Sequence, residues 1–249
     1  MKIKIIKYIA FLCFFALISF TIISKDPIVI YIIGDSTAAN KNPKSFPETG
    51  WGMELGSSFG KGVKVDNRAL NGRSTKSFIN EKRWDSVMST LKEGDYVLIE
   101  FGHNDEKVEN PKVGTSLEEY KANLIKYIQE TQGKKANPIL LTPIARRNFK
   151  GGILTDTHGK YPDVVRKLAD SLHIPLIDMQ RKTEQLISGL GEQPSVKLFN
   201  HVDSGHVNYP KGKKDNTHLS PEGAKAVAGL VVQGIVETKI GLAKYLIKK

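Results

Sequence analysis

A serine, a histidine and an aspartate have the types and positions that acyl transfer requires. Ser36 stands in the sequence GDST, directly after a short apolar run, and Asp215 and His218 stand in the sequence DNTH, directly before a helical pattern. A serine hydroxyl attacks a carbonyl carbon when a histidine takes its proton and a carboxylate orients the imidazole. We therefore predict Ser36 as nucleophile, His218 as general base and Asp215 as the residue that holds the imidazole.

A glycine and an asparagine could bind the oxyanion that such an attack creates. Gly72 stands in NRALNGRS and Asn104 in FGHND, each shortly after an apolar run. The backbone N–H groups of Ser36 and Gly72 and the side-chain amide of Asn104 would supply three donors. Each of these residues alone is an ordinary turn or cap residue. Their joint placement after successive strands favours the prediction of an oxyanion hole.

Short β-branched runs alternate with longer helical patterns along the chain, which is typical of a parallel sheet with helices on both faces. In such a sheet, ligands bind at the carboxyl ends of the strands, where Ser36, Gly72 and Asn104 would meet. The predicted strands are Ile28–Ile33, Val63–Asp66, Tyr96–Phe101, Ile139–Thr142 and Ile174–Asp178. The predicted helices are 51–58, 75–92, 116–132, 161–172, 180–189 and a final one from Ser220-Pro221 to about Lys239.

Two long polar stretches, 143–160 and 191–217, have weak periodicity and are predicted as functional loops. The basic segment 240–249 is predicted as a docked terminal helix.

Asp35, His103 and Asp105 flank the candidate residues, and we interpret them as residues whose hydrogen bonds shape the loops.

The first 24 residues differ from the rest. Lys2, Lys4 and Lys7 precede an uncharged apolar run from Tyr8 to Ser24 of about 17 residues, the pattern of a secretory signal. That length is just under what a membrane-spanning helix needs, and an uncleaved anchor is the alternative. We predict a signal peptide over 1–24 and a single hydrolase domain over 25–249. The mature protein would be periplasmic or secreted, with no stable membrane association after cleavage.

Charge and cysteine content limit the possible chemistry. The chain has 37 Lys and Arg against 26 Asp and Glu, a net charge of +11. The signal segment holds three of these lysines and the only cysteine, so residues 25–249 carry a charge of +8 and no thiol. Cysteine nucleophiles, thiolate metal sites and disulfides are thereby excluded there. A basic surface suits a polyanion such as an acidic polysaccharide or a nucleic acid.

Two other motifs compete with this interpretation. Ser58 in GSSFG matches the letters of a nucleophile elbow, but a helical pattern precedes it and a strand follows, the reverse of what that motif needs. A metal hydrolase is the second alternative, because five metal-binding side chains fall within 18 residues. Histidines five positions apart do not share a helix face, which argues against it. These five are His201, Asp203, His206, Asp215 and His218.

The blocks GDST, NRALNGRS, FGHND and DNTHLS resemble the signature blocks of the SGNH (GDSL-type) hydrolases, over nearly all of 28–238. With NGRSTKSF and TPIARRNF they are similar to the rhamnogalacturonan acetylesterases of carbohydrate esterase family 12. This resemblance implies a flavodoxin-like three-layer α/β/α sandwich whose five-stranded parallel sheet has the order 2-1-3-4-5. It also implies removal of acetyl groups from galacturonate units of pectin through an acetyl-enzyme on Ser36, with no metal or organic cofactor.

The resemblance and the basic charge together predict an acetylated acidic polysaccharide as partner, and no nucleic acid. Residues in the candidate loops would bind this polymer. Basic side chains would pair with its carboxylates, and an aromatic ring would stack on a sugar. Acetylxylan or another acetylated carbohydrate, acyl transfer instead of hydrolysis, and a non-catalytic polysaccharide-binding protein remain as alternatives. The predicted substrate-binding residues are Arg73, Arg147, His158, Tyr209 and Lys211.

Overall fold

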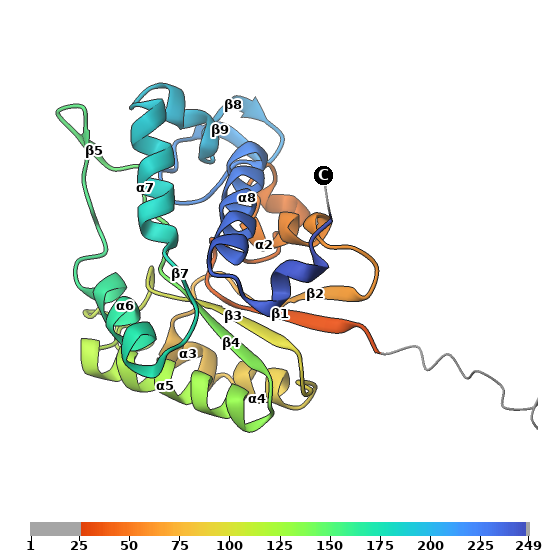
Figure 1. Cartoon of the computed structure of the whole chain (residues 1–249). Coiled ribbons are helices and arrows are strands. Elements are labelled where there is room, and N and C mark those ends of the chain that lie inside the picture. The colour runs from red at the N-terminus through yellow and green to blue at the C-terminus, as the bar shows by residue number, and fades with distance from the viewer. Residues whose placement is uncertain (1–25, 248–249) are drawn as a thin grey trace, which may run out of the picture.

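The structure, a computed structural model, describes residues 26–247, so the predicted signal segment lies outside the described residues. A five-stranded parallel sheet forms its centre (Figure 1). The strand order β2-β1-β3-β4-β7 confirms the expected order 2-1-3-4-5. The strands are β1 (Ile28–Gly34), β2 (Val63–Asn67), β3 (Tyr96–Glu100), β4 (Asn137–Leu141) and β7 (Leu176–Ile177).

Both faces of the sheet are covered by helices, which confirms the three-layer α/β/α architecture (Figure 1). Successive side chains of a strand point to opposite faces. In β1, Ile30 and Ile32 therefore pack into one hydrophobic core, and Tyr31 and Ile33 into the other. The first core is covered by α2 (Trp51–Glu54), α7 (Met179–Leu190) and α8 (Pro221–Glu237), and the second by α3 (Thr75–Asn80), α4 (Arg83–Met88), α5 (Leu117–Gly133) and α6 (Tyr161–Leu172).

Polar caps explain why two of the long helices begin where the sequence predicts. The Ser116 hydroxyl accepts from the N–H of Glu119 at the start of α5. The Ser220 hydroxyl accepts from the N–H of Gly223, and Pro221 occupies the first position of α8. A cap satisfies an N–H group that has no partner inside the helix, and proline at the first position loses no hydrogen bond.

Three predicted helices differ from the structure. The segment 75–92 forms two helices because Lys82 adopts a left-handed conformation (φ 60°) between α3 and α4. In 51–58, the short helix α2 is followed by a 3-10 helix, Leu55–Ser58. The C-terminal segment forms a 3-10 helix over Gly241–Tyr245, and Leu246 then pairs with Phe59.

The two long polar stretches contain short antiparallel hairpins that the sequence analysis missed. One consists of β5 (Phe149–Lys150) and β6 (Ile153–Leu154), joined by a Gly-Gly turn, which is a hairpin signal that two-residue strands make hard to notice. The other consists of β8 (Val202–His206) and β9 (Tyr209–Lys213), preceded by a 3-10 helix over Pro194–Leu198.

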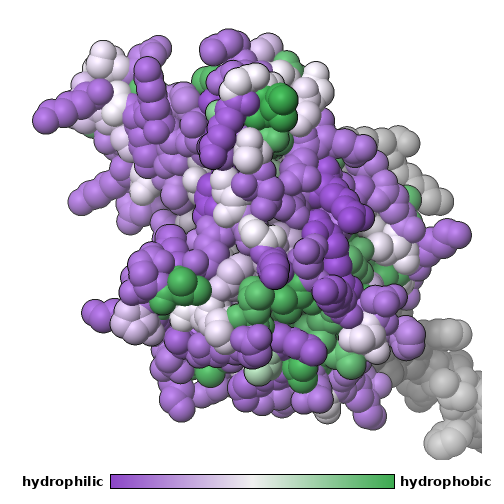
Figure 2. Space-filling model, turned by 90° about the vertical axis from the view of Figure 1, so that its left-hand side faces the viewer, coloured by the Kyte–Doolittle hydropathy of each residue, from purple (hydrophilic) through white to green (hydrophobic). Residues whose placement is uncertain are grey.

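Within residues 26–247, no helix is both long enough and apolar enough to cross a membrane. Figure 2 shows the side of the molecule that lies at the left in Figure 1, where hydrophilic side chains cover most of the surface and hydrophobic ones gather in limited patches. The large apolar side chains of the strands are instead buried in the two cores.

Candidate active site

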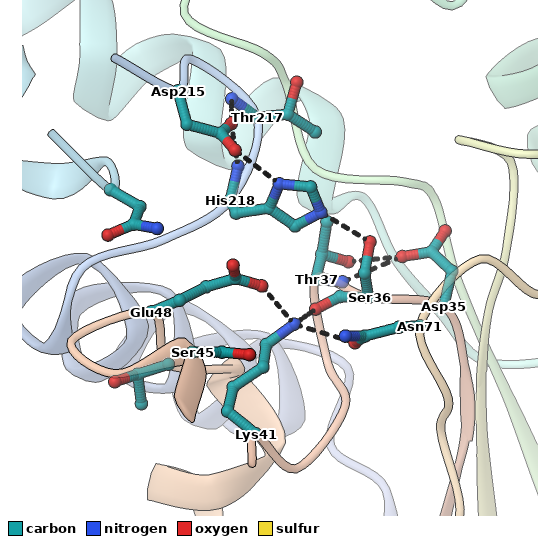
Figure 3. Close-up of polar contacts among 12 residues, drawn as sticks. Asp35, Ser36, Thr37, Lys41, Ser45, Glu48, Asn71, Asp215, Thr217 and His218 are labelled. Carbon is teal, nitrogen blue, oxygen red and sulfur yellow. Dashed lines mark hydrogen bonds and ion pairs between the residues drawn. The ribbon is translucent and has the colours of Figure 1, made fainter. Parts of the chain in front are cut away.

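Ser36, His218 and Asp215 form a continuous line of hydrogen bonds (Figure 3). Nε2 of His218 lies 2.9 Å from Oγ of Ser36. Nδ1 of the same ring lies 2.8 Å from Oδ2 of Asp215. Ser36 and His218 are 182 positions apart in the chain, and the fold brings them together because β1 ends beside the segment that leads into α8.

The segment 215–218 holds the carboxylate of Asp215 toward the imidazole. Oδ1 of Asp215 accepts from the N–H groups of Thr217 and His218, both at 2.9 Å. Burial opposes ionisation of Asp215, but the hydrogen bonds from the His218 ring and from these N–H groups outweigh it and hold the pKa of Asp215 well below its usual range. The carboxylate is therefore charged at neutral pH, and Lys213 Nζ lies 3.2 Å from its Oδ2.

A tight turn after β1 presents Ser36. Oδ1 of Asp35 accepts from the N–H and the hydroxyl of Thr37, both at 2.9 Å, so the chain folds around Ser36. Gly34 lets β1 end close to β3, because a Cβ at this position would lie only 2.5 Å from the carbonyl oxygen of Glu100. The expectation that Asp35 shapes this loop agrees with these contacts.

Gly72 and Asn104 lie in the turns that follow β2 and β3. Gly72 has a φ of +76°, a conformation that favours glycine. Nδ2 of Asn104 donates to the carbonyl oxygen of Arg73 at 3.0 Å, and Oδ1 of Asn104 accepts from Nζ of Lys107 at 2.8 Å. Because an amide nitrogen carries two N–H groups, one remains for a ligand oxygen. Sequence reasoning did not find Lys107, although its spacing of three residues from Asn104 allows contact within a turn.

Two predicted substrate-binding residues are engaged inside the protein, and that prediction is corrected for both. Arg147 is 8% exposed, and its guanidinium donates to the carbonyl oxygen of Glu192 and to Oδ1 of Asn216. His158 is 2% exposed, with Nδ1 2.7 Å from Glu106 Oε2 and Nε2 2.9 Å from a backbone oxygen. Both side chains are almost fully buried, and their hydrogen bonds hold loops together.

The other three predicted substrate-binding residues are more accessible. Arg73 forms an ion pair with Glu81 at 3.0 Å, and the same carboxylate also pairs with Arg83 at 2.6 Å. The hydroxyl of Tyr209 donates to the carbonyl oxygen of Ser45, and Lys213 covers one face of its ring at 5.3 Å from the centroid. Lys211 on β9 is exposed and has no carboxylate oxygen within 4.0 Å among residues 26–247.

A buried polar cluster lies under the turn that carries the nucleophile. Asp35, Glu100 and His103 each offer one atom, and these three atoms all lie within 4.8 Å of one another. Among the residues that the structure describes, these three therefore form a group that could hold a cation. Burial and the charge of Asp35 raise the pKa of Glu100 to about 8, and burial lowers the pKa of His103 well below its usual range. A protonated Glu100 and a neutral His103 reduce the cost of burying three titratable groups together. None of the five residues of the alternative metal site belongs to this cluster. Of its histidines, His201 directly precedes β8, His206 ends it, and His218 contacts Ser36.

The state of Glu100 predicts how stability depends on pH. The unfolded chain releases this proton near pH 4.5, whereas the folded protein keeps it to about pH 8. Between these values the folded state binds the extra proton, so the free energy of unfolding should fall as pH rises, by up to about 1.4 kcal/mol per pH unit. Urea denaturation of the wild type and of Glu100→Gln between pH 5 and 8 measures this. The variant should lose this part of the slope. Parallel curves of unfolding free energy against pH for the two proteins would contradict the assignment of a protonated Glu100 in the folded state.

Comparison with known proteins places the chain in a family. The model of the GDSL-like lipase/acylhydrolase family matches residues 32–226, a range that includes Ser36 and His218. The chain is 38% identical over 227 residues to the rhamnogalacturonan acetylesterase RhgT of Bacillus subtilis, which covers 90% of this chain and 97% of the relative. It is 26% identical over 233 residues to a rhamnogalacturonan acetylesterase of Emericella nidulans, covering 86% of each.

Solved structures agree with the fold. Protein YxiM of Bacillus subtilis superposes with a TM-score of 0.75 and 27% identity, over 86% of this chain and 58% of that one. The acetylxylan esterase Axe2 of Geobacillus stearothermophilus has a TM-score of 0.61 at 19% identity, over 84% of this chain and 94% of that one. The chain therefore belongs to the GDSL-like lipase/acylhydrolase family and is a carboxylic ester hydrolase.

Proposed function

We propose that the protein is a serine esterase that removes O-acetyl groups from acetylated rhamnogalacturonan through an acetyl-enzyme on Ser36. The hydrogen-bonded line from Ser36 through His218 to Asp215 carries the proposal for the reaction. Similarity to RhgT along 97% of that protein's length supports the choice of substrate.

In the first half of the reaction, Oγ of Ser36 attacks the acetyl carbon and Nε2 of His218 takes the hydroxyl proton. Asp215 accepts from Nδ1 of the ring, keeps Nε2 free as the base and stabilises the imidazolium that forms. The tetrahedral intermediate then collapses. The C–O bond to the sugar breaks, and the imidazolium returns the proton to the sugar oxygen that leaves.

The negative oxygen of the intermediate needs donors that are already in place. We assign this role to the N–H groups of Ser36 and Gly72 and to the free side-chain N–H of Asn104. Lys107 donates to the oxygen of the Asn104 amide, which fixes the amide with its nitrogen toward the site and increases its polarity.

In the second half, water attacks the acetyl-enzyme. His218 takes a proton from this water and passes it to Oγ of Ser36 as the acyl bond breaks. Acetate leaves and the serine is restored. The products are acetate and a free sugar hydroxyl, and the step consumes one water molecule.

Exposed cations beside the site favour an acidic glycan. Lys211 and Lys214 are exposed on and just after β9, close to Asp215 in the chain, and neither has a carboxylate partner within the part of the chain that the structure describes. Galacturonate carries one carboxylate per sugar unit, so these lysines would attract it and not a neutral xylan. We assign Lys211 and Tyr209 to substrate binding.

We also propose export, because a polymeric cell-wall substrate is found outside the cell and residues 1–24 have the pattern of a signal peptide. The mature enzyme would be periplasmic or secreted.

Acetate release from three polymers tests the substrate. At equal acetyl concentration, kcat/KM is expected to be highest on acetylated rhamnogalacturonan, lower on acetylated homogalacturonan and lowest on acetylated xylan. The double variant K211Q/K214Q should lose activity on the two acidic polymers and keep it on p-nitrophenyl acetate. The reason is that the two lysine charges removed by the substitutions act only on a charged polymer.

Each other ranking has a defined meaning. Preference for xylan would replace the proposal with an acetylxylan esterase. Binding of pectin without release of acetate would identify a non-catalytic binding protein. Transfer of the acetyl group to an added sugar acceptor as a new ester, without release of free acetate, would identify an acyltransferase.

A further inference from the structure

Lys41 is a buried lysine five residues after the nucleophile. It is 7% exposed, whereas the ammonium group of a lysine normally stays in water. Burial lowers the pKa of Lys41, and the hydrogen bond and charge of Glu48 oppose this effect. A charge is buried in a protein only where other groups replace its water, so the contacts of this ammonium indicate its role.

All three N–H groups of the ammonium have an acceptor (Figure 3). Nζ lies 2.5 Å from the carbonyl oxygen of Ser36, 2.9 Å from Oδ1 of Asn71 and 2.7 Å from Oε1 of Glu48. Ser36 belongs to the turn after β1, and Asn71 to the turn after β2. One ammonium therefore joins two loops that are far apart in the chain.

These two loops supply both proposed backbone donors of the oxyanion hole, Ser36 and Gly72, and Gly72 directly follows Asn71. Preorganised donors stabilise an oxyanion only if their separation is fixed before the reaction. Lys41 contacts the carbonyl of Ser36 and not its hydroxyl, so it does not touch the reacting atoms. We infer that Lys41 is a positioning residue that fixes the distance between the two backbone donors. The inference rests on the proposed function.

The charges around Lys41 continue to the other side of the site. Glu48, a buried carboxylate, lies between Lys41 and Lys213, whose Nζ is 3.7 Å from Glu48 Oε2. Lys213 in turn lies 3.2 Å from Asp215. The carboxylate of Glu48 compensates the positive charge of the buried lysine. The alternating charges also connect the segment after Ser36 with the segment that carries Asp215.

Lys41→Met tests the inference, because methionine keeps an unbranched side chain as far as the ε position and removes the ammonium with its three donors. We expect kcat on p-nitrophenyl acetate to fall by about 10–100-fold with KM nearly unchanged, the size of loss that a small misplacement of a catalytic group causes. The matched control is Lys44→Met, which changes an exposed lysine three residues away and should keep wild-type rates.

Inhibition by benzeneboronic acid separates positioning from plain stability. This compound forms a tetrahedral adduct with serine and so resembles the intermediate. Its inhibition constant should rise in Lys41→Met by the same factor by which kcat/KM falls. A variant that melts at a lower temperature, but keeps kcat per folded molecule and the wild-type inhibition constant, would show that Lys41 only stabilises the fold and would overturn the inference.

Two further variants keep the test decisive if Lys41→Met fails to fold. The double variant K41M/E48Q removes both buried charges, and Asn71→Ala removes a single contact of Lys41 at an exposed residue. Both should reduce kcat, Asn71→Ala by a smaller factor, and wild-type kcat in both would overturn the inference. Ser36→Ala in the same assay distinguishes the failures, because retained activity there would refute the proposed function itself.

Discussion

Ser36→Ala is expected to remove esterase activity, with a fall in kcat on p-nitrophenyl acetate of about 10⁵–10⁶-fold. Alanine has no oxygen to form the acyl bond, so the remaining rate comes only from binding and from the oxyanion donors. Ser36 is 8% exposed, and its hydroxyl contacts His218, so the loss of one oxygen should leave the fold intact. Initial rates and a thermal melt of the purified variant measure both effects.

Ser58→Ala is the matched control, since Ser58 lies in the other serine motif, GSSFG. The structure places it at the end of a 3-10 helix, just before Phe59 and away from the strand-to-helix turn that a nucleophile elbow requires. Its activity should equal that of the wild type. A fully active Ser36→Ala together with an inactive Ser58→Ala would exchange the two assignments and refute the proposed nucleophile.

Asp215→Asn is expected to lower kcat by about 10⁴-fold. An asparagine can turn its N–H₂ toward Nδ1 of His218, which places the proton on Nε2, the atom that must accept from Ser36. The imidazolium also loses its compensating charge, and Lys213 loses its partner at 3.2 Å. Pre-steady-state rates of p-nitrophenol release would show a slow acylation step, because His218 acts as the base in that step.

Asp203→Asn provides the comparison for Asp215→Asn. Asp203 lies on β8, is exposed, and belongs to the group of residues that suggested a metal site. The triad assignment predicts wild-type rates for this variant. Equal losses in the two variants, restored by added zinc, would support metal hydrolysis instead.

The layers of the fold could be predicted because their signals are local. Strands β1, β3 and β4 are nearly continuous apolar runs, which is what a strand covered on both faces requires. The starts of α5 and α8 follow from Ser116 and Ser220, whose hydroxyls cap them. The break at Lys82 could not be predicted, because an exposed lysine gives no signal of a left-handed backbone.

The pairing of Asp215 with His218 could also be predicted, because three residues of chain suffice to form it. Ser36, Gly72 and Asn104 could be proposed because the ends of parallel strands share one edge of a sheet. For Arg147 and His158, sequence reasoning identified the correct loop but not the direction of the side chains. Their burial depends on partners such as Asn216 and Glu106, which lie far from them in the chain.

The sequence by itself determined the strands, the family and the residues that could form an acyl-transfer site, because each depends on periodicity or on short motifs, and the order of the strands followed from the resemblance to the family. Only the tertiary structure decided which charges lie inside. Nothing in the sequence distinguishes Lys41 from the other lysines of the chain, yet Ser36, Asn71 and Glu48 surround its ammonium. The physical reason is that the burial of a charge depends on groups that other loops bring to it, and neither composition nor spacing records that arrangement.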